Sequence, residues 1–241
     1  MNISESVKNL TRFERALWLV SALAVIPTFF IGGVHGILSA ATSLIGVTAL
    51  IFVAKGDVLG QVLCLIFATL YGIISFSFSY YGEMITYLGM SAPIALAAII
   101  SWARHPFEKG KNEVEVNALS PREYVLTLLS SLVVTAVFYF ILNALGTANL
   151  IPSTLSVATS LLASYLTFRR SRFYAVAYAA NDIVLIVLWI LATLSDVKYI
   201  AMVVCFVMFL ANDLYGFINW TKMKNEQKKA KKELPTNDEQ I

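Results

Sequence analysis

The stretch LSAATSLIG (38–46) returns 117 positions later as LSVATSLLA (155–163), with seven of the nine positions identical or similar. The same offset carries Lys55 onto Arg172, and each of these residues stands just before an apolar segment. Short apolar stretches of sequence also recur by chance in a hydrophobic chain. The aligned positive charge favours a true internal repeat, and the rest of the sequence can be organised around it.

The composition is that of an integral membrane protein. Of the 241 residues, 58% are hydrophobic and only 14% are charged, and the mean hydropathy is +0.73. A soluble domain carries about a quarter charged residues, so these values indicate a membrane protein before any motif is considered. The two cysteines, Cys64 and Cys205, both lie inside apolar segments and suggest neither a disulfide framework nor a zinc site.

Eight segments are apolar over a length that can cross a bilayer, which takes about 20 residues. We expect spans at 16–34, 36–54, 58–80, 84–103, 123–145, 151–168, 173–194 and 199–220. Their continuous apolar character predicts helices, because barrel strands would alternate over about ten residues. No small-residue cleavage site and soluble domain follow the first segment, so we interpret it as a membrane helix rather than a secretory signal.

Positive charges gather on one side of these spans. They are Lys8, Arg12, Arg15, Lys55, Arg104, Lys109, Lys111, Arg122, Arg169, Arg170, Arg172 and the six lysines between Lys222 and Lys232. The other side holds little besides Lys198 and the acidic Glu83. Loops rich in lysine and arginine stay in the cytoplasm. We therefore expect a multi-pass protein of the cytoplasmic (inner) membrane of the cell, with both termini cytoplasmic.

The repeat divides the eight spans into two similar groups. The repeated stretches lie in spans two and six. When one residue is inserted in the alignment, Trp102 falls on Trp220, and each tryptophan lies near the end of the third helix of its group. An odd linker helix gives both groups the same orientation. The predicted fold is therefore an all-α membrane protein with eight transmembrane helices in a 3+1+3 arrangement behind one extra helix. The expected boundaries are 1–35 for the extra helix, 36–104 for the first repeat, 105–150 for a cytoplasmic loop and linker helix, 151–221 for the second repeat and 222–241 for a polar tail.

The lysine-rich tail after Lys222 admits two interpretations. It could contact anionic lipid, or it could be a disordered end that only reinforces the orientation. We favour the disordered end.

Span seven gathers polar and aromatic residues on one face. At 100° per residue, Tyr174, Tyr178, Asn181, Asp182 and Trp189 fall within an arc of about 100°. Asp182 lies at mid-membrane, where a carboxylate costs at least ~2.5–3.5 kcal/mol. It must therefore face a cavity, find a partner or be protonated. The face is either a ligand site, in which the rings stack on a planar ligand, or a set of contacts between helices; we favour the ligand site.

Span eight carries ANDLYGFINW (211–220), in which two costly residues are adjacent. Asn212 shares a face with Tyr215, whereas Asp213 points about 100° away from Asn212. We expect Asn212 to face the interior of the bundle and Asp213 to face a neighbouring helix.

The first repeat offers weaker candidates. Gln61 starts a small and polar stripe in span three, as a gate residue or as a side chain that only reaches the interface, and Tyr87 lies in span four. Pro93 falls almost where Asn212 falls in the second repeat. Matching irregularities in two repeats point to the binding region of a carrier, although a passive proline kink is an equally good interpretation.

The chain resembles the PnuC family of vitamin transporters over about residues 36–222. The matching stretches are NDIVLIVLW (181–189) and NDLYGFINW (212–220), the latter a variant of the closing N/D-x-Y-G motif of that family. Family members have two three-helix repeats, a linker helix and an optional extra helix in front. The same plan is similar to that of the eukaryotic SWEET-type sugar carriers.

The resemblance also implies a substrate and its contacts. Nicotinamide riboside, a precursor of NAD, is the implied substrate, and related branches carry thiamine or riboflavin. Asn181, Trp189 and Asn212 are the implied contacts, and a homo-trimer is one expected assembly. The first repeat departs from some members, because APIALAAIISW (92–102) offers only Ala95 where they have an asparagine.

These features predict a passive carrier that exposes a mid-membrane site to each side in turn. The candidate substrate-binding residues are Asn181, Asp182, Trp189, Tyr178, Asn212, Tyr215, Gln61 and Tyr87. The resemblance, and not the spacing, implies that phosphorylation inside the cell traps the substrate. The sequence contains no nucleotide-binding loop, so we expect no ATP hydrolysis. We also expect no cofactor and no nucleic-acid partner.

Two rival functions remain at this stage. One is a carrier of thiamine or another ring-containing vitamin, with or without proton coupling through Asp182. The other is an intramembrane enzyme or a sensor. The enzyme is disfavoured because no span carries a histidine pair, a metal cluster or a serine beside a base, and the sensor because the chain has no sizeable soluble domain.

Overall fold

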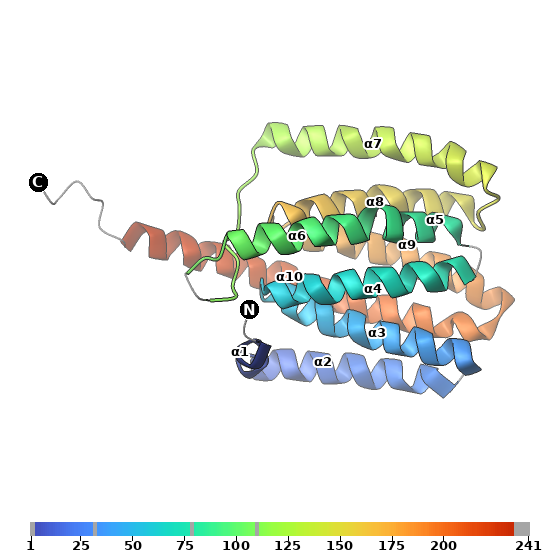
Figure 1. Cartoon of the computed structure of the whole chain (residues 1–241), viewed down its shortest axis with the longest axis horizontal. Coiled ribbons are helices and arrows are strands. Elements are labelled where there is room, and N and C mark those ends of the chain that lie inside the picture. Colours follow the sequence, from blue (N-terminus) through green and yellow to red (C-terminus); the bar gives the residue numbers. More distant parts are fainter. Residues whose placement is uncertain (1–2, 31–32, 78–79, 109–110, 234–241) are drawn as a thin grey trace, which may run out of the picture.

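The computed structural model describes residues 3–30, 33–77, 80–108 and 111–233, and within them the chain is all-helical (Figure 1). The elements are α1 (Ile3–Lys8), α2 (Arg12–Val25), η1 (Ile26–Phe30), α3 (Gly33–Ala54), α4 (Val58–Ser77), α5 (Tyr81–Thr86), η2 (Tyr87–Ser91), α6 (Ala92–Arg104), α7 (Pro121–Ala144), α8 (Leu150–Phe168), α9 (Tyr174–Ser195), η3 (Val197–Tyr199) and α10 (Ile200–Glu233). The long helices run side by side, as expected for a bundle that crosses a membrane.

Seven helical segments in the described part of the chain are long and apolar enough to cross a membrane. They correspond to predicted spans two to eight, with α5, η2 and α6 together forming span four. The protein is therefore a multi-pass membrane protein. Their ends agree with the sequence expectation to within a few residues, except at the end of α10.

The predicted first span differs from the other seven. Its α-helix, α2, has only 14 residues, and a 3₁₀ segment, η1, follows it to Phe30. Pro27 has no backbone N–H to continue the α-helical ladder, so the chain tightens there. An α-helix of this length is shorter than the roughly 20 residues that a span requires.

Six helices form a closed ring. α3 packs against α4, α4 against α6, α6 against α8, α8 against α9, α9 against α10, and α10 against α3. Outside the ring, α7 packs on α8 and α2 packs on α3 and α10, and the two outer helices lie at opposite edges of the molecule (Figure 1). Only 11% of the apolar window of α7 is buried, so most of this helix is available to lipid.

The segment that contains Pro93 departs from a regular α-helix just before the proline. Pro93 stands at the start of α6, and the preceding residues, Tyr87–Ser91, form the single wide π-turn η2. The proline cannot donate to the residue one turn before it, and the wide turn accommodates the missing bond. Tyr87 and Ser91 of this turn face the interior of the ring.

The tail is helical over most of its length, so its interpretation as a disordered end is wrong for residues 222–233. α10 continues without a break to Glu233. Gln227 is buried, accepts a hydrogen bond from the backbone N–H of Val116 and donates to the carbonyl of Val114. These long-range contacts anchor a segment that is too polar to be held by lipid. Residues 234–241, and Lys109, lie outside the described residues.

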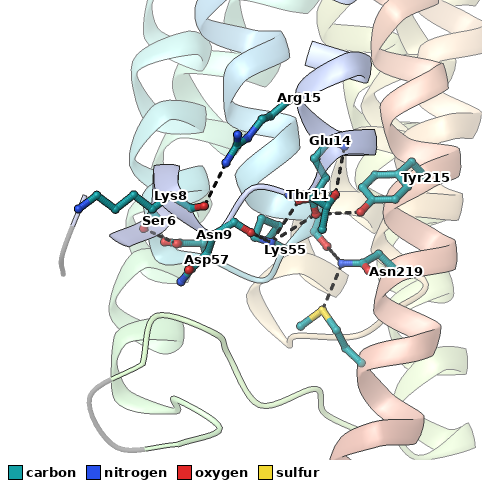
Figure 2. A network of polar contacts seen from close by, with 12 residues as sticks. Ser6, Lys8, Asn9, Thr11, Glu14, Arg15, Lys55, Asp57, Tyr215 and Asn219 are labelled. Carbon is teal, nitrogen blue, oxygen red and sulfur yellow. Dashed lines mark hydrogen bonds and ion pairs between the residues drawn. The ribbon is translucent and has the colours of Figure 1, made fainter. Parts of the chain in front are cut away.

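A buried carboxylate ties α2 to the ring. Glu14 is 1% exposed and accepts hydrogen bonds from the backbone N–H of Thr11 (2.6 Å), the hydroxyl of Tyr215 (2.8 Å) and Nζ of Lys55 (3.3 Å). Figure 2 shows these groups converging from α2, the end of α3 and α10. Because Lys55, Arg104 and Arg170 share this end of the bundle, we call it the basic end.

Candidate functional site

A small cavity lies inside the ring of six helices. It is lined from both groups of three helices, with residues of α3, α4, η2 and α6 on one side and of α8, α9 and α10 on the other. Its accessible volume is about 60 Å³. A water molecule needs at least ~10–15 Å³ measured in this way, so the cavity has room for a few waters. A nucleoside or vitamin would fit only after the helices move apart.

Five of the eight predicted site residues line this cavity: Gln61, Tyr87, Tyr178, Asn181 and Asp182. Asn181 is held in one orientation, because its Oδ1 accepts hydrogen bonds from the hydroxyls of Thr159 (2.8 Å) and Ser160 (3.0 Å). Its amide N–H groups are therefore left to donate to a ligand.

The other three predicted residues do not line the cavity. Trp189 is fully buried and donates from Nε1 to the hydroxyl of Tyr71 (2.9 Å). Asn212 donates from Nδ2 to the hydroxyl of Ser21 on α2 (3.2 Å) and to the carbonyl of Met208. Tyr215 lies at the basic end, in the contacts around Glu14.

Asp213 is the main cavity residue that the sequence interpretation missed. It lines the cavity together with Asp182. The expectation for the pair on α10 was therefore reversed: Asp213 faces the interior and Asn212 faces the neighbouring helix α2. The two side chains do point in directions about 100° apart around the helix axis, as expected for adjacent residues. The sequence could not show which side of α10 faces the ring.

Aromatic rings form one wall of the cavity. Phe67 on α4 lies with its ring centroid 6.1 Å from that of Tyr87 and 5.1 Å from that of Phe209 on α10. Phe67 and Phe209 were not candidates, because a phenylalanine in a membrane span gives no signal that separates a binding wall from ordinary packing.

Reciprocal hydrogen bonds close the cavity at the basic end. On α6, Trp102 Nε1 donates to the carbonyl of Thr167 (2.9 Å) and Ser101 donates to that of Phe168 (3.1 Å), both on α8. On α10, Trp220 Nε1 donates to the carbonyl of Val53 (2.9 Å) and Asn219 donates to that of Ala54 (2.8 Å), both on α3.

The two tryptophans stand at equivalent positions of the sequence repeat. Their rings are in contact, with centroids 5.4 Å apart, and both side chains are fully buried. Val53 and Thr167 also line the cavity, so this layer lies directly on its basic side.

The opposite end is closed by different residues. The bond from Trp189 to Tyr71 connects α9 to α4, and the ring of Tyr80 packs edge-on against Trp189 at 5.0 Å. Beside them, Ser156 on α8 donates to Glu83 on α5 (2.5 Å). Contacts between the two groups of helices therefore cross the bundle at both ends of the cavity.

The comparison with protein families decides the class of protein to which this cavity belongs. The model of the nicotinamide mononucleotide transporter family matches residues 36–222. The chain belongs to this family. The match confirms the resemblance to PnuC transporters, and membership makes the protein a transporter and not an enzyme.

Relatives of the family agree in sequence and structure. The chain is 30% identical to the nicotinamide riboside transporter PnuC of Neisseria mucosa, over 88% of this chain and 82% of that protein. It is 26% identical to the nicotinamide riboside transporter PnuC of Haemophilus influenzae, over 74% and 76% of the two chains. A crystal structure of the vitamin B3 transporter PnuC matches with a TM-score of 0.80 and 27% identity, over 91% of this chain and 94% of that one.

Proposed function

We propose that the chain carries nicotinamide riboside across the cell membrane by facilitated diffusion. The relatives named as nicotinamide riboside transporters support this substrate. The observation that carries the proposal is the cavity inside the helix ring, where amide groups, two aspartates and aromatic rings stand among apolar side chains. Such a lining suits a flat, positively charged ring with a polar sugar. Phosphorylation of the nucleoside in the cytoplasm would then drive net uptake.

The charge of the cavity favours the riboside over the mononucleotide. Its described lining contains two aspartates and no lysine, arginine or histidine. A phosphate group carries close to two negative charges at pH 7 and requires cationic partners or backbone donors. The phosphorylated nucleotide would therefore be excluded on either side of the membrane, and conversion to it inside the cell would trap the substrate.

The transport step in this proposal is a rocking of two three-helix repeats, 36–104 and 151–221. α7 is the linker helix between them and 1–35 is the extra helix. The reciprocal bonds from Trp102 and Trp220 support the repeats, because each group donates to the other from equivalent positions. Breaking these bonds would open the basic end, and breaking the contact of Trp189 with Tyr71 would open the other.

The orientation follows from the charges. The basic end would be cytoplasmic and the tail of α10 would extend into the cytoplasm, in the inner membrane of the cell. The exposed apolar surface of α7 would be turned toward the membrane.

The substrate contacts of the proposal come from the cavity lining. Asn181 and Gln61 would hydrogen-bond the amide or the sugar, Tyr87 and Tyr178 would contact the ring, and Asp182 would face its charge. For Trp189, Asn212 and Tyr215 to touch substrate, each would have to leave its present partner.

A second candidate is a proton-coupled carrier, which the carboxyl pair Asp182–Asp213 favours. Uptake into vesicles with and without a pH gradient separates the two. A facilitator equilibrates nicotinamide riboside without concentrating it, whereas a coupled carrier accumulates it when the gradient is imposed.

The substrate is tested by calorimetric binding to the purified protein. We expect nicotinamide riboside to bind at least about tenfold more tightly than nicotinamide mononucleotide, because the cavity offers the phosphate no cation. Thiamine and riboflavin, measured in parallel, should bind more weakly than the riboside. Preference for either vitamin would replace the substrate, and tight binding of the mononucleotide would contradict the charge argument.

A further inference from the structure

Residues 111–117, which belong to the connection between α6 and α7, lie across the basic end of the bundle. They lie beside the part of α10 that extends beyond the ring (Figure 1). We call these residues the cover segment. Val114 at its centre is fully buried, in the same apolar cluster as Trp102 and Trp220. Connections normally run over the surface of a protein and expose their side chains. This one instead covers the tryptophan layer from the basic side.

Main-chain hydrogen bonds join the cover segment to the first group of helices. The N–H of Val114 donates to the carbonyl of Gly56, in the turn between α3 and α4, and the N–H of Glu115 donates to that of His105, directly after α6 (2.9 Å each). Gly56 has a φ of +67°, and a β-carbon there would lie 3.2 Å from Cγ1 of Val114. The fit between the cover segment and this turn is therefore close, and it requires a glycine.

A single glutamine side chain joins the same segment to the second group. Gln227 of α10 is 4% exposed, although it lies in a polar stretch of the helix. Its Oε1 accepts from the N–H of Val116 (2.8 Å), and its Nε2 donates to the carbonyl of Val114 (3.0 Å) and to Oε1 of Glu113 (2.9 Å). The amide thus replaces a neighbouring strand for an extended piece of backbone.

Arg170, in the turn after α8, is the other connection to the second group. Its Nε donates to the carbonyl of Glu115 (3.2 Å), and its own carbonyl accepts from the N–H of Asn117 (2.9 Å). Its Nη1 donates to the hydroxyl of Ser101 on α6 (2.8 Å). The cover segment is therefore bonded to both groups of helices, and it cannot keep all of these bonds when the groups separate.

We propose that the cover segment is the lid of the carrier at its basic end, and that Gln227 is the positioning residue that holds the lid closed. The inference rests on the alternating exposure in the proposed function, but not on which substrate is carried. In the open form, the lid stays on Gly56 and His105 and separates from Gln227. Water can satisfy the polar groups that this separation exposes, whereas separating an apolar contact of the same size would be costly. Polar contacts of this kind are typical of interfaces that open and close.

The lid is tested with Gln227→Met, which keeps the length of the side chain and removes its three hydrogen bonds. Cys64 lines the cavity and is the reporter, in a Cys205→Ala background and in sealed vesicles of known orientation. A membrane-impermeant maleimide applied from the basic side should label Cys64 at least about tenfold faster than in the protein that retains Gln227. Applied from the opposite side, it should label Cys64 no faster, because the lid closes one end only.

Two outcomes would overturn the lid. One is an unchanged labelling rate from the basic side. The other is faster labelling from both sides, because a merely structural role of Gln227 would loosen the whole bundle. Asn225→Met is the matched control, since it places the same new side chain on the exposed face of the same part of α10, and it should keep both rates.

A second variant tests the lid from its other partner. Val114→Ala removes apolar contact with the tryptophan layer and leaves Gln227 in place, and it should also accelerate labelling from the basic side alone. Labelling needs no substrate, so it decides the lid separately from the proposed function. Failure of the unsubstituted protein to take up nicotinamide riboside would contradict that function and would leave the labelling result to stand by itself.

Discussion

Replacing Asn181 with alanine is expected to weaken nicotinamide riboside binding by about 30-fold. Its Oδ1 is engaged by Thr159 and Ser160, so the amide is pre-oriented with its N–H groups available to the ligand. The substitution removes that donor and leaves the acceptor group of the ligand buried without a partner. Each such loss is worth roughly 1 kcal/mol or more, and a factor of 30 corresponds to about 2 kcal/mol. Calorimetric titration of the purified variant measures the effect.

Asparagine-to-alanine substitutions at two other positions show whether the loss of affinity is specific to Asn181. Asn143→Ala removes an exposed asparagine from α7 and should leave the affinity unchanged. Asn212→Ala then decides between the substrate contact that the family resemblance implies and the hydrogen bond to Ser21 of α2 in this structure. Wild-type affinity in Asn181→Ala would show that Asn181 does not contact the substrate and that the orientation of its amide does not matter for binding.

Replacing both Trp102 and Trp220 with phenylalanine is expected to open the basic end. Phenylalanine keeps an aromatic ring in the layer but loses the indole N–H, so the bonds to Thr167 and Val53 disappear. At roughly 1 kcal/mol for each bond, the balance between open and closed forms should shift by about 30-fold. Cys64 lines the cavity and provides the readout. In a Cys205→Ala background, a membrane-impermeant maleimide applied from the basic side should label Cys64 correspondingly faster.

Trp18→Phe is the control for this experiment. Trp18 makes the same kind of bond, from Nε1 to the hydroxyl of Thr48 (2.9 Å), but it does so on α2 outside the ring. Its loss should not change the labelling rate of Cys64. Equal labelling of the double variant and the wild type would show that the tryptophan layer does not hold the basic end closed.

The apolar lengths in the sequence predicted seven of the spanning segments, because lipid exposure imposes a length that few other constraints override. The polar face of span seven predicted Tyr178, Asn181 and Asp182 at the cavity, because polar side chains inside a membrane are costly unless they face the interior of the bundle. Trp189 lies on that face too, yet it seals the far end. A helical wheel gives direction around the axis but no depth, and Trp189 lies about 10 Å along the helix from Asp182.

Long-range contacts account for most of what the sequence did not reveal. The direction of Asp213 depends on α10 touching α2, α3 and α9 at once, which periodicity within one helix cannot indicate. The helical tail depends on Gln227 reaching the segment around Val114. Pro27 is visible in the sequence, but the apolar length of the first segment does not show that the α-helix ends just before it.

The reciprocal bonds at the basic end have the form of an isologous interface, in which each half donates what it also accepts. In a two-fold dimer of one such three-helix bundle, each copy would need only one tryptophan and one neighbouring donor for both sets of bonds to form. Fusing two copies through a linker would thus preserve the closure without any new contact. Each half could then diverge at other positions, one toward a proline and a wide turn, the other toward carboxyl and amide groups.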